Sequence, residues 1–245
     1  EYGGDHLTVA AAGEATRWQI DPRWRGTPAL VIEEGAPLPR VSWMTFARDG
    51  SAALLGTLDG GRIVRTDGSV VSLDAEGETV TSLDVRTQSL IVGTSGSTVR
   101  VWDAGGTPLR THSLDGEARQ GQLSAGAGHY AALSLSGTVY VWEAETGEGT
   151  LELDAPGTPR TLTTAPDGSR VAFAGQDGPI WVYEVAGASE RARLEVPEPG
   201  RWHTLVFTDG GRTVLAAGER GVYSWSEPDW KPVALHDGED HYVRL

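Results

Sequence analysis

The sequence lacks two residue types and almost lacks a third. It has no cysteine and no asparagine, and Lys231 is its only lysine, whereas arginine is plentiful. The absence of cysteine excludes disulfides, thiolate catalysis and cysteine-based metal sites. Without asparagine there is no acceptor for N-glycosylation. Because asparagine and lysine codons are AT-rich, this bias favours a high-GC bacterial source.

Positive charge and long apolar runs are also scarce. The chain has 20 basic and 34 acidic residues, a net charge of −14, which would repel a nucleic-acid backbone. No apolar run approaches the roughly eighteen residues of a membrane span, and no leader peptide opens the sequence. We therefore expect a cytoplasmic protein without nucleic-acid or membrane partners. Because the chain begins with Glu1, we expect a domain excised from a longer multidomain protein.

What the sequence does contain is a repeated pattern of turns and strands. In residues 163–184 the turns PDG and QDG separate three short strands rich in β-branched and aromatic residues. The second half of this module, a turn and alternating apolar residues ending in an aromatic residue and an acid or its substitute, recurs about every forty residues. Its six copies end at Gln19, Asp67, Asp103, Glu143, Glu184 and Ser226.

At these residues the chain resembles the WD-repeat β-propellers, in which each repeat is a four-stranded blade whose third strand ends in Trp-Asp. The pair is complete only at Trp102-Asp103, and the Gly-His dipeptide that opens a family repeat is missing. Degenerate forms end at Glu143, Glu184 and Ser226. The resemblance implies one all-β domain over residues 1–245, in a family that mostly provides scaffolds for binding. The repeat period predicts that five aromatic residues at one repeat position pack between neighbouring blades, namely Trp102, Trp142, Trp225, Tyr183 and Trp18.

The two ends of the chain predict a closed ring. Residues 6–34 match the second, third and fourth strands of a blade, whereas residues 240–245 (DHYVRL) match a first strand. Joining the ends continues the spacing seen between Phe207 and Trp225. We therefore expect a six-bladed β-propeller of four-stranded antiparallel blades, in which the C-terminal strand completes the N-terminal blade and covers its edge. The isolated domain is expected to be monomeric.

Motifs for catalysis and cofactors are missing from the sequence. The segment GTSGS at 93–97 ends in serine where a nucleophile elbow needs glycine. Lys231 follows Trp230 rather than a glycine-rich phosphate loop. Acid-glycine pairs such as Asp177-Gly178 lack the spaced acids of a calcium loop and suit hairpin turns. We therefore predict no enzyme activity, no catalytic residues, no metal and no cofactor.

Two groups of residues remain as candidate binding sites. The segments IDPRW at 20–24 and SEPDW at 226–230 share an acid-Pro-x-Trp pattern, which predicts an aromatic and basic contact patch on one face. It comprises Trp24, Arg23, Arg25, Trp230 and Lys231. The alternative is that each tryptophan folds back as a cap on its own fourth strand. A second set, at the starts of first strands near the channel mouth, comprises Trp43, Arg119, Arg160, Trp202, His203, His241 and Tyr242.

The sequence thus favours a protein- or peptide-binding propeller, a scaffold or sensor domain of a larger bacterial protein. The alternative function is a small-molecule-binding or hydrolytic site at the mouth of the central channel. Converging charged residues with shifted pKa values at that mouth would favour the alternative.

Overall fold

The computed structural model describes residues 6–11, 14–19, 41–47, 52–86, 90–125, 128–155, 159–175, 178–195, 200–219 and 221–236. These residues form antiparallel strands and one short 3-10 helix, η1 (Asp209–Gly211). The first two strands form a two-stranded sheet, β1 (His6–Ala11) with β2 (Glu14–Gln19).

The remaining strands form five four-stranded sheets, each built from consecutive strands. The first two contain β3 (Val41–Phe46), β4 (Ala52–Thr57), β5 (Gly60–Arg65), β6 (Val70–Leu73), and β7 (Val80–Arg86), β8 (Leu90–Ser95), β9 (Thr98–Asp103), β10 (Pro108–Ser113). The third contains β11 (Ala118–Ala125), β12 (His129–Ser134), β13 (Thr138–Glu143), β14 (Gly149–Asp154). The last two contain β15 (Thr161–Thr164), β16 (Arg170–Ala174), β17 (Ile180–Glu184), β18 (Ser189–Leu194), and β19 (Trp202–Thr208), β20 (Thr213–Gly218), β21 (Gly221–Ser226), β22 (Lys231–His236).

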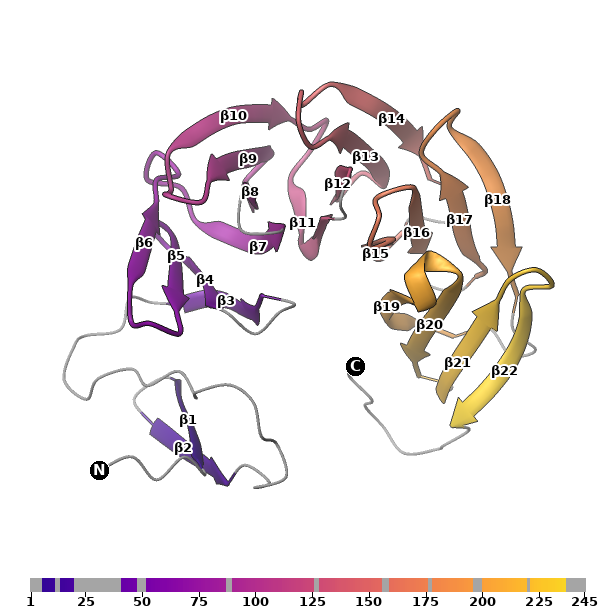
Figure 1. The fold of residues 1–245 in the computed structure, drawn as a ribbon, viewed down its shortest axis with the longest axis horizontal. Coiled ribbons are helices and arrows are strands. Elements are labelled where there is room, and N and C mark those ends of the chain that lie inside the picture. Colours follow the sequence, from indigo (N-terminus) through magenta and orange to yellow (C-terminus); the bar gives the residue numbers. More distant parts are fainter. Residues whose placement is uncertain are drawn as a thin grey trace.

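The five sheets follow one another around an arc (Figure 1). The first strand of each sheet lies on the inner side of the arc and the fourth strand on the outer side. Neighbouring inner strands contact each other in sequence, from β3 through β7, β11 and β15 to β19. This arrangement of repeated sheets is compatible with a propeller-like fold.

Local sequence explains the strands and turns. The predicted PDG turn closes where the Gly168 N–H donates to the Ala165 carbonyl at 2.9 Å, with Gly168 at a φ of 78° that glycine adopts without strain. The middle strands are apolar on both faces, as in β13, where five of six residues are buried. A strand buried on both faces must lie between two neighbouring sheets.

The hydrophobic core is divided into clusters that lie between neighbouring sheets. Trp102 of β9 packs with Leu54 and Ile63 of the preceding sheet. Trp225 of β21 packs in the same way with the β15–β18 sheet, and Trp142 with the β7–β10 sheet. The prediction of packing between neighbouring repeats is therefore confirmed for the three tryptophans. Tyr183 is partly buried against the core between the β11–β14 and β15–β18 sheets, and the side chain of Trp18 lies outside the described residues.

The prediction of six four-stranded blades closing a ring is wrong. The described residues contain five four-stranded sheets, the first repeat provides only the β1–β2 pair, and no sheet closes. A physical reason is that β1 and β2 carry only Leu7, Val9 and Trp18 as large apolar residues, too few to bury two sheet faces. The segments predicted to complete this blade, 28–34 and 240–245, lie outside the described residues. In the described part of the chain, no helix is long and apolar enough to cross a membrane.

Candidate functional site

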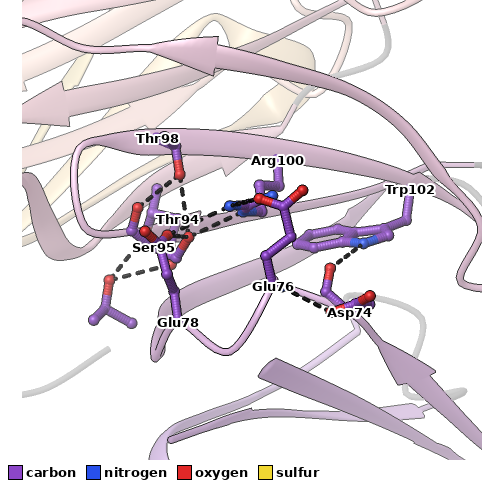
Figure 2. A network of polar contacts seen from close by, with 9 residues as sticks. Asp74, Glu76, Glu78, Thr94, Ser95, Thr98, Arg100 and Trp102 are labelled. Atoms are coloured by element: carbon purple, nitrogen blue, oxygen red, sulfur yellow. Dashed lines mark hydrogen bonds and ion pairs between the residues drawn. The ribbon is translucent and has the colours of Figure 1, made fainter. Parts of the chain in front are cut away.

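The most extensive polar cluster joins the β3–β6 and β7–β10 sheets (Figure 2). Arg100 of β9 is buried and points toward the link between β6 and β7, residues 74–79. Its Nη2 lies 3.0 Å from Glu76 Oε2 and 3.5 Å from Glu78 Oε2, and its Nε donates to Ser95 Oγ at 3.2 Å. The Ser95 hydroxyl in turn donates to Glu78 Oε2 at 2.7 Å. The buried guanidinium is thus neutralised by two carboxylates of the link.

The link itself is held in a tight turn. Glu76 has a φ of 57°, and its N–H donates to Asp74 Oδ1 at 2.7 Å. A left-handed conformation costs a non-glycine residue about 1–2 kcal/mol. The Asp74 carbonyl accepts the indole N–H of Trp102 at 3.0 Å (Figure 2). These contacts fix the link against the sheet that follows it.

A second network occupies the same place at the next junction. Asp115, in the link after β10, accepts hydrogen bonds from Ser136 Oγ at 2.6 Å and from Thr138 Oγ1 at 2.8 Å. Its backbone N–H donates to the Tyr140 hydroxyl at 3.2 Å. The hydrogen bond from Ser136 is the largest cause that lowers the pKa of Asp115, to about 2. Both networks therefore pair an acid of a link with the hairpin that follows it.

At the opposite ends of the strands, arginine side chains connect neighbouring sheets by hydrogen bonds to backbone carbonyls. Arg65 Nη2 donates to the Ala104 carbonyl at 2.6 Å, and Arg110 donates to the Ala144 carbonyl at 2.9 Å. Arg170 Nη1 donates to the Gly211 carbonyl at 3.0 Å. In each case the arginine of one sheet reaches a turn of the next sheet.

These networks join neighbouring sheets. Their carboxylates accept hydrogen bonds from serine, threonine or arginine side chains of the same or the adjoining repeat. Within the described ranges, no group of three or more histidine, aspartate or glutamate side chains could hold a metal ion. The arrangement ties neighbouring sheets of the arc together.

Two of the predicted contact residues, Trp230 and Lys231, are described. Trp230 ends the β21–β22 turn, where its N–H donates to the Ser226 carbonyl at 2.9 Å. Its indole is partly buried against the core between the last two sheets. The Lys231 side chain is 82% exposed, and its Nζ lies 3.8 Å from Asp229 Oδ2. Arg23, Trp24 and Arg25 lie outside the described residues, so the predicted patch stays a prediction.

Only part of the second set of candidates is described. Trp43 packs against the core beside the β7–β10 sheet, and Trp202 is buried with its Nε1 3.2 Å from the Gly178 carbonyl. Arg160 and His203 are exposed. The side chain of Arg119 and the residues His241 and Tyr242 lie outside the described part of the chain. Binding at the channel mouth stays an untested prediction.

Sequence reasoning missed two features. One is the buried Arg100, whose signal was a lone charge inside the apolar strand TVRVWD. The other is a cation–π contact, in which the Arg193 guanidinium lies 4.9 Å from the ring centre of Trp181. Trp181 of β17 and Arg193 of β18 lie directly opposite each other in the sheet. Counting residues from the turn between the two strands could have predicted this pairing.

Comparison with known proteins adds no family to this picture. No protein-family model matches the chain, and no curated protein matches its sequence.

Proposed function

We propose that the chain is a protein- or peptide-binding module, a scaffold or sensor domain of a larger bacterial protein, with repeats similar to those of WD-repeat propellers. The Trp102-Asp103 pair supports this similarity. Asp103 Oδ1 accepts the backbone N–H groups of Gly105 and Thr107 at 2.9 and 2.8 Å, so that the acid closes the β9–β10 turn.

The proposed contact surface lies on the outer strand β22. The Lys231, Val233 and Leu235 side chains are all well exposed, with Val233 at 55% and Leu235 at 56%. The corresponding positions of the other outer strands include Leu151, which is buried against the next sheet. Exposed aliphatic residues in a row beside a tryptophan and a lysine are typical of contact sites.

The conformation of Trp230 supports the same surface. Trp230 has a φ of 51°. Three of the corresponding turns hold a glycine at positive φ, Gly68, Gly106 and Gly147, and the β17–β18 turn holds Gly187 and the small residue Ala188 at positive φ. Gly147 even donates the same type of hydrogen bond, to the Glu143 carbonyl. A bulky residue costs about 1–2 kcal/mol in this conformation. Because glycine would adopt this conformation without strain, the presence of tryptophan at position 230 indicates a functional role for its indole.

The partner is expected to bind through side chains rather than by adding a strand. Pro232 has no N–H to donate along the edge of β22, and a charged residue such as Lys231 hinders strand pairing. The contact surface is therefore the row Trp230, Lys231, Val233 and Leu235.

Site-specific cross-linking tests this proposal. A photoreactive residue placed at Val233 should capture a partner protein from the source cells, and Val233→Ser or Trp230→Ala should then weaken binding of the purified partner by about thirtyfold or more. The control position is Leu135, which is exposed in the β12–β13 turn. If both positions capture the same proteins with equal efficiency, β22 is not the contact surface.

A further inference from the structure

The outer strand β10 places a histidine where neighbouring repeats place leucine. Leu73 of β6, Leu153 of β14 and Leu194 of β18 lie opposite corresponding residues near the start of the third strand of their sheets. In β10 this position is His112. Leu73 and Leu194 are buried in the cores shared with the following sheets. In β22 the position is His236, whose side chain lies outside the described residues.

The His112 ring fills the junction with the β11–β14 sheet. Its Nε2 lies 2.7 Å from the hydroxyl of Tyr130 on β12, which is fully buried. Its ring centre lies 4.7 Å from that of Trp142 on β13, with the two planes 21° apart. The histidine thus stacks on one residue of the next sheet and shares a hydrogen bond with another.

Burial and the charge of Arg110 favour the neutral form of this ring. Burial lowers the pKa of His112, and the positive charge of Arg110, two residues earlier on the same strand, lowers the pKa further. Arg110 is fixed there because it donates to the Ala144 and Glu145 carbonyls at 2.9 and 2.6 Å. From β12 the ring faces Tyr130 and from β13 it faces Trp142, with Tyr140 behind the indole.

We propose that His112 makes the junction between the β7–β10 and β11–β14 sheets sensitive to acid, so that the neutral ring holds the sheets together and the protonated ring loosens them. Protonation adds a second positive charge beside Arg110 in a partly buried site. It also makes both ring nitrogens donors, so that the Tyr130 hydroxyl can only accept the hydrogen bond from Nε2.

The sign of the effect follows from linkage. Because the pKa of His112 in the folded chain lies below its ordinary value of about 6.5, the unfolded chain binds the proton more readily. The stabilisation is therefore complete above the ordinary pKa and is lost as pH falls below it toward the pKa in the folded state.

Thermal unfolding of the full chain at about pH 7.5 and about pH 5.5 tests the proposal. His112→Leu restores the residue of the neighbouring repeats, and His112→Gln keeps a partner for Tyr130 without titrating in this range. The parent midpoint should fall between the two pH values by a few degrees more than either variant midpoint. An equal fall in the parent and both variants would overturn the proposal.

An NMR titration of the parent gives a second readout that does not depend on the stability of a variant. The His112 ring signal, assigned as the one missing from His112→Gln, should titrate below its ordinary pKa. The ring signals of Trp142 should shift with the same midpoint, since the two rings are stacked. A His112 midpoint at or above the ordinary value, or Trp142 signals that do not follow it, would contradict the proposed device.

Discussion

The indole Nε1 of Trp102 donates a hydrogen bond of 3.0 Å to the backbone carbonyl of Asp74, the first residue after the outer strand of the preceding sheet. Trp225 repeats this relationship with the Glu195 carbonyl at 3.3 Å, and Glu195 also follows directly after an outer strand. The third-strand tryptophan therefore has two roles. It fills the core between two sheets, and it fastens the link between them.

Replacing Trp102 by phenylalanine should remove both contributions. We expect Trp102→Phe to lower the free energy of unfolding by about 1–3 kcal/mol, through the lost hydrogen bond and the cavity left by the smaller ring. Urea denaturation measures this change. Trp225→Phe should behave similarly because its indole makes the corresponding bond. An unchanged urea midpoint in both variants would show that neither contact matters for stability.

The strands and turns were predictable because their signals are local. A glycine turn, a β-branched run and an aromatic end lie within about ten residues of one another. Even β11, with the weak pattern ARQGQLSA, forms a strand, because pairing with β12 holds it despite a register shift between Ala118 and Leu123. The ring closure was not predictable in this way. The prediction assigned residues 6–34 and 240–245 to one blade because their spacing fits the repeat. Spacing alone, however, does not supply the apolar side chains that a further sheet needs for its packing.

Two glycines, each in the turn between the third and fourth strands of its sheet, test how closely neighbouring sheets approach each other. Gly106 has a φ of 86°, and a Cβ there would lie 2.6 Å from the Ser72 carbonyl oxygen of the preceding sheet. Gly68 has a φ of 83°, but a Cβ would meet nothing within 4 Å. Gly68→Ala should thus cost only the backbone strain of about 1–2 kcal/mol. Gly106→Ala should cost about 1–3 kcal/mol more because of the clash. Equal losses in thermal unfolding would argue against close packing at this junction.

The polar networks could not be read from the sequence because they are tertiary pairings. Arg100 stands out in its strand, but its partners Glu76 and Glu78 lie in the preceding link, beside a third acid, Asp74. The strain at Glu76 and Trp230 was equally hidden, since the positive φ of a non-glycine residue leaves no local signal. By contrast, Trp230 and Lys231 were found as candidates because the repeat itself has no need of them.

The Asp115 network predicts a loss of stability in acid. The pKa of Asp115 is lowered from 3.8 to about 2 because Ser136 and Thr138 donate to the carboxylate. Its stabilising contribution is therefore present above the ordinary pKa and is lost as pH falls through the lowered one. The difference in urea midpoint between the parent and Asp115→Asn should shrink as pH falls from about 4 to about 2.

The control for this network is Ser136→Ala, which removes the largest cause of the shift. An NMR titration of the carboxyl group should find the pKa of Asp115 raised in this variant toward its ordinary value. A pKa that stays the same in Ser136→Ala would contradict the assignment of the hydrogen bond.

Trp230 offers the sharpest test of the contact surface, because its backbone and indole can be separated. Trp230→Gly removes the indole and suits the φ of 51°, whereas Trp230→Ala removes the indole and keeps the strain. If the indole anchors a partner, both variants should weaken binding by about 2 kcal/mol or more, with the glycine variant about 1 kcal/mol more stable than the alanine variant. Val70→Ser, at an exposed apolar position of β6, should leave affinity unchanged.

If Trp230 is only a cap on the core, both Trp230 variants should lose stability while each folded molecule binds the partner as tightly as the parent does. Melting temperature and partner affinity measured on the same preparations distinguish these outcomes.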